Sequence, residues 1–273
     1  MKRSLICVFI FFLSSLSWVF AQKVETVEIY SEGMKKRIKN IVILPDGYDS
    51  LAEEKYPVIY LLHGYGGGYE SWLNQTKPSL PTEATKRGVI FVCPDGDNSW
   101  YWDSPVDPKM KYDTYISYEL VSYIDSIYQT IPSPSGRAIA GASMGGHGAL
   151  WLAINHPDVF GACGSISGCV DIRPFSDNWD MKKWLGNYKS NKARWNQYTV
   201  INLLDKIKPE MLIILDCGVD DFFYTVNEDL HKQMMGKKIL HDYITRPGNH
   251  SHAYWSNAID YQIQSFSKFF RLN

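Results

Sequence analysis

The sequence lacks a basic segment of the kind that binds nucleic acid or anionic lipid. Its 28 Lys and Arg residues nearly balance its 29 Asp and Glu residues, and the formal net charge is −1. Nucleic-acid binding needs a basic footprint that neutralises phosphates, and a polybasic anchor needs Lys or Arg clustered beside the membrane. We therefore expect neither a nucleic-acid partner nor an anchor of that type.

Cysteine is scarce, and its spacing fits neither a zinc site nor a CxxC redox motif. Cys7 falls in the first apolar segment, and the others are Cys93, Cys163, Cys169 and Cys217. Cys163 and Cys169 are near enough in sequence to form a local disulfide bond. The alternative is that these cysteines are buried thiols at strand ends. No metal or organic cofactor is implied by either arrangement.

The first residues have the pattern of an export signal. Lys2 and Arg3 give a short positive start, residues 5–20 are apolar apart from serines, and small residues precede a cleavage point after Ala21. We therefore expect residues 1–21 to be a signal peptide and the mature protein to be secreted or periplasmic, without a stable membrane span. The alternative is an uncleaved anchor, for which the apolar run is slightly short.

The rest of the chain contains no internal repeat and no low-complexity linker, so we expect residues 22–273 to form a single domain. Its length of 273 residues with 45% apolar residues suits one large globular unit. The aromatic content of 14% is enough to fill a core and still line a binding cleft.

Strand and helix patterns alternate along this domain. Residues 24–30 and 37–44 alternate between apolar and polar, which predicts an antiparallel strand pair at the N-terminus. Unbroken apolar runs, typical of parallel strands covered on both faces, occupy residues 58–62, 89–93, 138–141, 163–166 and 211–215. Apolar residues at helical spacing mark 116–127 and 255–270. We predict an α/β fold with a mostly parallel central sheet flanked by helices and without a large separate cap domain. Residues 170–208 are harder to interpret: they suggest either short helices over the strand ends or a solvated connection.

A nucleophile motif follows the strand expected at residues 138–141. The segment 141–145, Gly-Ala-Ser-Met-Gly, matches G-x-S-x-G between a strand and a helix, the context of the α/β-hydrolase nucleophile. Glycines permit a turn tight enough to raise the Ser143 hydroxyl above the sheet. The alternative is a glycine-rich turn without chemistry.

A glycine-rich loop, residues 63–68, follows the strand at residues 58–62. In this fold the loop supplies one backbone N–H to the oxyanion and the residue after the nucleophile supplies another. We expect Tyr65 and Met144 to be these donors and His63 to brace the loop. A phosphate-binding loop is the alternative, but no G-K-[ST] follows.

The acid and base are expected after the last two strands, because the triad order in this fold is Ser, Asp or Glu, His. Asp221 is the predicted acid and Asp220 its alternative, with the remaining acid serving as a helix cap. A strand over residues 239–245 is followed by two histidines. His250 is the predicted base, because it follows a Pro-Gly turn most directly, and His252 is the alternative.

These segments together resemble the esterase D-like superfamily of α/β-hydrolases. That superfamily includes feruloyl and acetyl xylan esterases of carbohydrate esterase family 1, S-formylglutathione hydrolases and mycolyltransferases. The matching segments are 56–64, 94–96, 141–146 and 217–221, with His250 and Trp255. The resemblance implies the same roles for Ser143, Asp221, His250, Tyr65 and Met144. One departure is His252, where relatives often have an aromatic residue.

The function that we expect is that of an exported serine carboxylic-ester hydrolase acting through an acyl-enzyme on plant polysaccharide or its oligosaccharides. Export argues against S-formylglutathione hydrolysis, whose substrate is cytosolic. Trp100, Tyr101 and Trp102 are predicted to stack on a sugar or feruloyl ring, the alternative being rings packed beneath a loop. An acyltransferase of the mycolyltransferase type is the enzyme alternative. An inactive hydrolase fold that binds glycans is the non-enzyme alternative.

Overall fold

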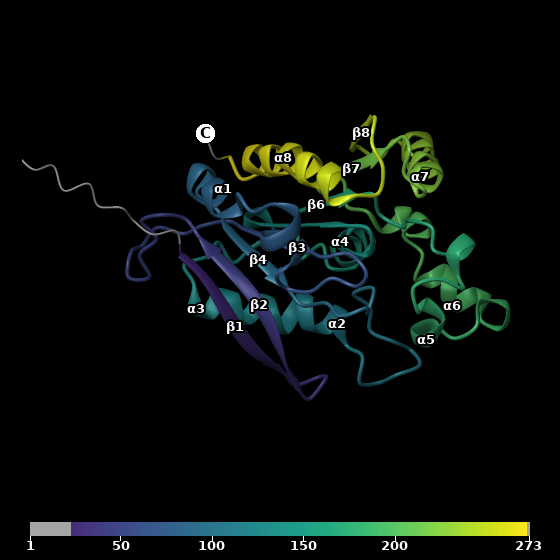
Figure 1. Cartoon of the computed structure of the whole chain (residues 1–273), viewed down its shortest axis with the longest axis horizontal. Coiled ribbons are helices and arrows are strands. Elements are labelled where there is room, and N and C mark those ends of the chain that lie inside the picture. Colours follow the sequence, from purple (N-terminus) through teal and green to yellow (C-terminus); the bar gives the residue numbers. More distant parts are fainter. Residues whose placement is uncertain (1–22, 272–273) are drawn as a thin grey trace, which may run out of the picture.

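The described part of the chain forms one 8-stranded sheet with helices on both faces (Figure 1). The computed structural model describes residues 23–271. The strand order is β1-β2-β4-β3-β5-β6-β7-β8. The expected signal peptide, residues 1–21, lies outside the described residues.

The antiparallel part of the sheet lies at its N-terminal end. β1 (Lys23–Ser31) pairs with β2 (Lys36–Leu44), which pairs with β4 (Ile90–Pro94), both antiparallel. The other strands are parallel: β3 (Val58–Leu62), β5 (Arg137–Ala142), β6 (Ala162–Ile166), β7 (Leu212–Gly218) and β8 (Asp242–Arg246). The predicted mostly parallel sheet with an antiparallel pair at the N-terminus is therefore confirmed.

Helices cover the two faces of the sheet unequally. Two pack on one face, above the sheet in Figure 1: α1 (Leu80–Arg87) and α8 (His252–Phe269). Those that pack on the other face are α2 (Tyr112–Thr114), α3 (Val121–Ile127), α4 (Met144–Asn155) and α7 (Tyr224–Gly236). A π-helical stretch, Tyr115–Leu120, joins α2 to α3. The apolar stripe predicted over residues 116–127 ends early, because Ile127 is 54% exposed.

The last two strands differ from their predicted limits. The strand expected at residues 239–245 is β8, which spans Asp242–Arg246. β7 was expected at residues 211–215 but continues to Gly218, and Asp216 pairs within the sheet with Ile244 of β8. A carboxylate inside a strand breaks the apolar pattern, yet Asp216 is fully buried. It is tolerated because Arg246 and Tyr254 both bind its carboxylate.

Short helices occupy the connection between β6 and β7. They include α5 (Met181–Leu185) and α6 (Lys192–Gln197), which lie together at the right of Figure 1. Trp195 is fully buried and Trp184 nearly so, while Trp179 reaches the pocket that contains Ser143. Of the two alternatives for this segment, short helices extending to the strand ends are the one that the structure shows.

The cysteines of the described chain are free thiols in the interior. Cys93, Cys163, Cys169 and Cys217 are all buried, and none is in a disulfide. Burial raises the pKa of each thiol, to about 12 for Cys163. A thiol that stays protonated is a poor nucleophile and a poor metal ligand. Buried thiols, rather than a Cys163–Cys169 bridge, are therefore the arrangement present.

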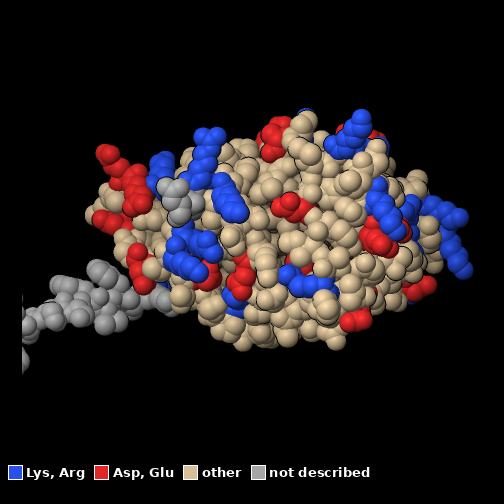
Figure 2. Space-filling view, turned by 90° about the horizontal axis from the view of Figure 1, so that it is seen from above, with Lys and Arg blue, Asp and Glu red and all other residues tan. Residues whose placement is uncertain are grey.

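The face that carries α1 and α8 mixes basic and acidic side chains (Figure 2). Lys77 and Asp260 form an ion pair at 2.7 Å there, as do Arg87 and Glu83 at 3.5 Å. Because the two signs are interspersed, this face has no uniform basic footprint for a polyanion. Over residues 23–271, none of the helices has the length and apolar character needed to cross a membrane.

Candidate active site

Ser143 lies on a sharp turn between β5 and α4. Its φ of 59° and ψ of −116° cost a non-glycine residue about 1–3 kcal/mol and persist only where the surroundings enforce them. A Cβ atom at position 145 would lie 2.2 Å from the Leu62 carbonyl oxygen, and one at position 141 would lie 2.4 Å from the backbone of residue 145. The glycines therefore let β3, β5 and α4 approach closely enough to force the turn, and Ser143 remains partly exposed.

The Ser143 hydroxyl meets His250, which lies on the loop between β8 and α8. His250 Nε2 is 2.9 Å from Ser143 Oγ, and His250 Nδ1 is 2.9 Å from Asp221 Oδ2. An ionised carboxylate only accepts hydrogen bonds, so Nδ1 carries the proton. The neutral ring then presents the lone pair of Nε2 to the serine hydroxyl. In this arrangement an imidazole can take the hydroxyl proton.

Of the two acids after β7, Asp221 is the one in contact with the histidine. Its side chain is fully buried, whereas Asp220 is exposed. Asp221 Oδ1 also accepts a hydrogen bond from the Phe223 amide at 2.8 Å, just before α7 begins. This bond fixes the carboxylate that faces His250. No side chain caps α7, so the capping role expected of the remaining acid is not present.

The second histidine of this loop, His252, lines the same pocket but bonds elsewhere. Its Nδ1 is hydrogen-bonded to Thr76 Oγ1 at 2.8 Å. Burial, and to a lesser extent the charge of His250, lower the pKa of His252. The structure thus brings His250 to Ser143 and holds His252 in the pocket wall.

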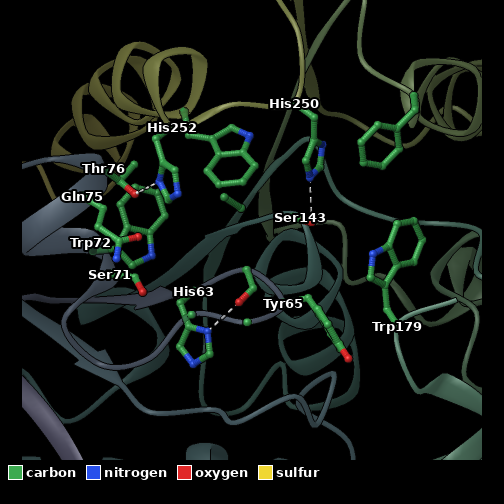
Figure 3. A pocket seen from close by; sticks show the side chains of 16 residues that line it. His63, Tyr65, Ser71, Trp72, Gln75, Thr76, Ser143, Trp179, His250 and His252 are labelled. Atoms are coloured by element: carbon green, nitrogen blue, oxygen red, sulfur yellow. Dashed lines mark hydrogen bonds between the residues drawn. The ribbon is translucent and has the colours of Figure 1, made fainter.

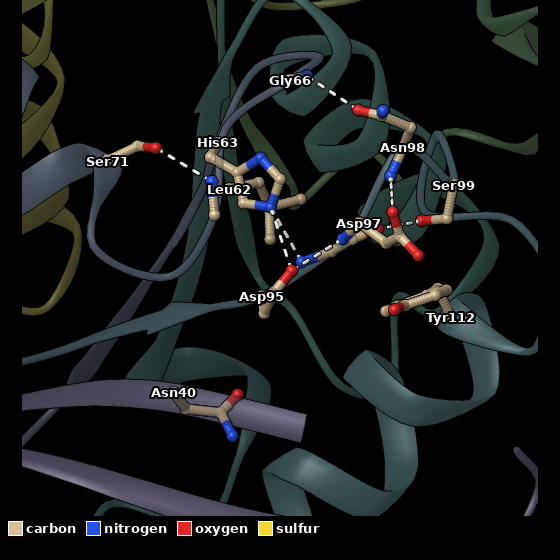
Figure 4. A network of polar contacts seen from close by, with 12 residues as sticks. Asn40, Leu62, His63, Gly66, Ser71, Asp95, Asp97, Asn98, Ser99 and Tyr112 are labelled. Atoms are coloured by element: carbon tan, nitrogen blue, oxygen red, sulfur yellow. Dashed lines mark hydrogen bonds and ion pairs between the residues drawn. The ribbon is translucent and has the colours of Figure 1, made fainter. Parts of the chain in front are cut away.

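The glycine-rich loop after β3 is braced by the loop after β4 (Figure 4). The Gly96 amide donates to His63 Nε2 at 2.8 Å, and the Gly66 amide donates to Asn98 Oδ1 at 2.7 Å. His63 Nδ1 in turn bonds to the Gly64 carbonyl oxygen at 2.8 Å. Both ring nitrogens of His63 are engaged by backbone, which is the bracing contact expected of it.

The residues predicted to bind the oxyanion flank Ser143. A Cβ atom at position 64 would lie 3.4 Å from Ser143 Cβ, so the backbone leading into Tyr65 passes beside the serine. Met144 is the first residue of α4, and its amide therefore has no acceptor within the helix. The positive end of the α4 dipole is at the same place. The Tyr65 hydroxyl donates to Asp180 Oδ2 at 2.8 Å, which ties this loop to the connection between β6 and β7.

The three rings predicted to bind substrate lie in the core instead. Trp100 is 1% exposed and Tyr101 and Trp102 are 0% exposed, and none of them lines the pocket beside Ser143. Trp102 Nε1 donates to His147 Nε2 at 2.9 Å. Burial lowers the pKa of His147 to about 4, which keeps its ring neutral and able to accept that bond. Packing beneath a loop, the alternative that the sequence left open, is what these rings do.

A pocket of about 240 Å³ opens beside Ser143 and His250 (Figure 3). One side is formed by polar and aromatic side chains: Trp72, Gln75, Thr76 and His252. Tyr65 and Trp179 lie on the other side (Figure 3). Phe222, which also lines the pocket, stacks on Trp179. Both walls flank Ser143. A ligand bound there would have the polar side chains of the first wall on one side, for hydrogen bonds, and the rings of the second wall on the other, for stacking.

The sequence predicts other roles for two residues of these walls, Tyr65 as an oxyanion donor and His252 as the alternative base. It assigns no role to Trp72, Gln75, Thr76, Trp179 or Phe222. Phe222 adjoins the predicted acid, and its position was a signal that could have been used. Trp179 and Asp180 both have positive φ, at 47° and 56°, a strain that only the folded chain reveals. Thr76 and Gln75 lie at the end of a short π-helical turn, Trp72–Thr76, which has no distinct sequence signal. Over residues 23–271, no group of three or more His, Cys, Asp or Glu is placed to hold a metal ion.

Comparisons with known proteins agree on the class of fold and enzyme. A family model described as "Putative esterase" matches residues 31–265. An acetyl esterase of Caldicellulosiruptor saccharolyticus is 25% identical over 267 residues, which cover 89% of this chain and 97% of that protein. A solved ferulic acid esterase is 26% identical with a TM-score of 0.80, over 92% of this chain and 99% of that chain. The fluorophosphonate-binding serine hydrolase F of Staphylococcus aureus, at 23% identity, has a TM-score of 0.80 over 90% of this chain and 98% of that chain. The architecture is that of the α/β-hydrolase esterases.

Proposed function

The chain belongs to the esterase family that matches it over residues 31–265, and we propose that it is an exported serine esterase that deacylates plant polysaccharide or its oligosaccharides. Ser143 is the proposed nucleophile, His250 the base and Asp221 the acid. One observation carries the proposal: the hydrogen bonds from Ser143 to His250 and from His250 to Asp221 are both 2.9 Å long and lie beside an open pocket.

Acylation begins with proton transfer from the serine hydroxyl. His250 Nε2 takes the proton of Ser143 Oγ as this oxygen forms a bond to the ester carbonyl carbon. The carbonyl electron pair moves to oxygen, and the amides of Tyr65 and Met144 bind the resulting oxyanion. One such donor is worth about 2.7–4 kcal/mol of transition-state stabilisation where water is excluded. Asp221 stabilises the imidazolium that forms.

The intermediate then expels the alcohol, and water completes the reaction. The bond between the carbonyl carbon and the alcohol oxygen breaks, and that oxygen takes the proton from His250 Nε2. The acyl group remains on Ser143 as an ester. His250 next takes a proton from water as the water oxygen bonds to the acyl carbon. The bond between that carbon and Ser143 Oγ then breaks, and Oγ takes the proton from His250 Nε2, which releases the carboxylic acid and free Ser143.

The size of the pocket supports a short acyl group or a single ring. Its volume of about 240 Å³ is below the range of about 300–1,000 Å³ typical of sites for drug-sized ligands. A long lipid chain of the kind moved by mycolyltransferases exceeds this volume and would have to extend out of the open pocket. Acetyl and feruloyl esters are consistent with this size and with the names of the acetyl esterase and the ferulic acid esterase to which this chain is similar.

A release assay tests the substrate class. We expect the protein to release acetate or ferulate from acetylated or feruloylated xylan, and also to cleave 4-nitrophenyl acetate. The Ser143→Ala variant is the control and should release neither. Cleavage of the aryl ester without acid release from either xylan would refute the polysaccharide proposal while leaving the esterase assignment intact.

The same assay with added sugar alcohol separates hydrolysis from acyl transfer. A hydrolase should release the same amount of free acid with or without the acceptor. A drop in free acid matched by acylated sugar alcohol would show that an acyltransferase is the better description. Chromatography of one reaction mixture measures both products, so the share of acyl groups that goes to water and the share that goes to the acceptor come from the same sample.

We propose that residues 1–21 are a signal peptide and that residues 22–273 form a single domain. The protein recovered from outside the cytoplasm should then begin at Gln22, because a small residue at Ala21 suits signal peptidase. Intact-mass measurement checks this directly. Exported protein that retains Lys2 and Arg3 would contradict the proposed cleavage.

A further inference from the structure

Both ends of the loop that carries His250 bind one buried carboxylate. The loop leaves β8 at Arg246 and enters α8 shortly before Tyr254. The carboxylate belongs to Asp216 of β7, whose side chain is 0% exposed. Asp216 Oδ2 accepts a hydrogen bond from Arg246 Nη2, and Asp216 Oδ1 accepts one from the Tyr254 hydroxyl at 2.6 Å. His250 lies between these two attachment points.

The ring of Tyr254 also supports the loop backbone directly. Gly248 has a φ of 147°, and a Cβ atom there would lie 2.3 Å from Tyr254 Cδ2. The ring therefore packs against the main chain two residues before His250. A Cβ atom at position 218, at the end of β7, would lie 2.2 Å from the Gly248 carbonyl oxygen. The loop is thus pressed between Tyr254 and the end of β7.

The same loop is joined to the segment that carries Asp221. The Val219 amide donates to the Arg246 carbonyl at 3.0 Å, and the Asp220 amide donates to the Gly248 carbonyl at 3.0 Å. Asp221 and His250 therefore lie on two segments connected by backbone hydrogen bonds. These backbone bonds hold the loop from Arg246 to Gly248, and the Asp216 carboxylate adds a side-chain contact on either side of His250, to Arg246 and to Tyr254.

We propose that Asp216, with Arg246 and Tyr254, positions His250 within proton-transfer reach of Ser143. The inference rests on the proposed role of His250 as the base. None of the three lines the pocket beside Ser143, so they act through the loop and not on the substrate. A buried carboxylate keeps its partners close because leaving it unpaired is costly, and both loop ends are held by the same group. A misplacement of about 1 Å at a catalytic group can cost about 100-fold in rate.

Removing one partner at a time tests the proposal. Tyr254→Phe deletes a single hydroxyl, and Arg246→Gln deletes the guanidinium. We expect each to lower kcat for 4-nitrophenyl acetate about tenfold and to leave KM within about twofold, since the pocket wall is untouched. Arg246→Lys keeps a cation near Asp216 and should retain more kcat than Arg246→Gln. The rate at which a fluorophosphonate labels Ser143 should decrease in parallel, because it reports serine activation.

Tyr128→Phe is a matched control at a distant position. The Tyr128 hydroxyl donates to Glu25 Oε2 at 2.7 Å, and both Tyr128 and Tyr254 are 7% exposed. This contact involves β1, at the opposite edge of the sheet from β8. Tyr128→Phe should leave kcat unchanged and lower the unfolding temperature less than Tyr254→Phe, because the Glu25 side chain is 29% exposed whereas Asp216 is 0% exposed. Equal kcat for the two variants would show that the Asp216 contacts only stabilise the fold, and the inference would be wrong.

The outcome is distinguishable from a failure of the proposed function. If His250→Ala retained turnover, His250 would not be the base, and the proposed function would be refuted. If His250→Ala lost turnover while Tyr254→Phe and Arg246→Gln kept full kcat, only the positioning role would be refuted. Thermal unfolding of each variant shows that the kinetic constants belong to folded protein.

Discussion

Replacing Ser143 with alanine should lower kcat for a short-chain aryl ester about 10⁴- to 10⁶-fold and leave the unfolding temperature nearly unchanged. The substitution removes the oxygen that would bond to the carbonyl carbon and keeps the Cβ atom that already occupies the strained turn at φ 59°. The pocket and the backbone amides stay in place, so residual turnover reflects binding and oxyanion stabilisation alone. Steady-state kinetics and thermal unfolding measure the two quantities.

Ser165→Ala is the matched control for this prediction. Ser165 lies on β6, the strand beside β5, and is 0% exposed, and its Oγ has no hydrogen-bond partner in the described structure. Its removal should leave kcat within about twofold. Covalent labelling by a fluorophosphonate, located by peptide mass spectrometry, should add mass at residue 143 of the wild-type protein. Undiminished turnover by Ser143→Ala would exclude this serine as the nucleophile.

The strands of the central sheet could be predicted where both faces are covered by apolar layers. The run at residues 58–62 coincides with β3, because every residue of that strand is buried and apolar. The end of β7 could not be predicted this way, since Asp216 reads as the polar residue that ends a strand. Its burial depends on Arg246 and Tyr254, which lie far along the chain. Pairing between distant segments leaves no local pattern.

The same distinction, between local patterns and contacts of distant segments, separates the site residues that the sequence predicts from those that it does not. The position of Ser143 is apparent from its sequence neighbours, because the turn needs glycine on either side within two residues. Asp221 and His250 follow strand ends, so their order and spacing are also visible. Trp179 lines the pocket because the connection between β6 and β7 folds back toward Ser143, which no local sequence pattern predicts. Trp100, Tyr101 and Trp102 were predicted to bind substrate but are buried, because an aromatic run is equally compatible with a core and with a surface that stacks on sugars.

Replacing His250 with alanine should lower kcat about 10⁴-fold, whereas His252→Ala should change kcat less than about tenfold. In the proposed mechanism His250 carries every proton transfer, including the first one from Ser143 Oγ, from which its Nε2 is 2.9 Å away. His252 is hydrogen-bonded to Thr76 and forms part of the pocket wall. Because the His250 ring packs against Phe222 at 4.3 Å between centroids, thermal unfolding should accompany the kinetics, and His250→Gln offers a variant with less change in volume.

The two histidine variants also differ in the kinetic constant that should change. Loss of the wall residue His252 alters the fit of the substrate and should raise KM, while loss of His250 removes groups that act in the transition state and should lower kcat with little change in KM. A large kcat effect confined to His252→Ala would reassign the base. For His252 to take that role, its bond to Thr76 would have to break, and its ring would have to displace His250 Nε2, which lies 2.9 Å from Ser143 Oγ in a ring held by Asp221. That cost is the physical reason to expect His250.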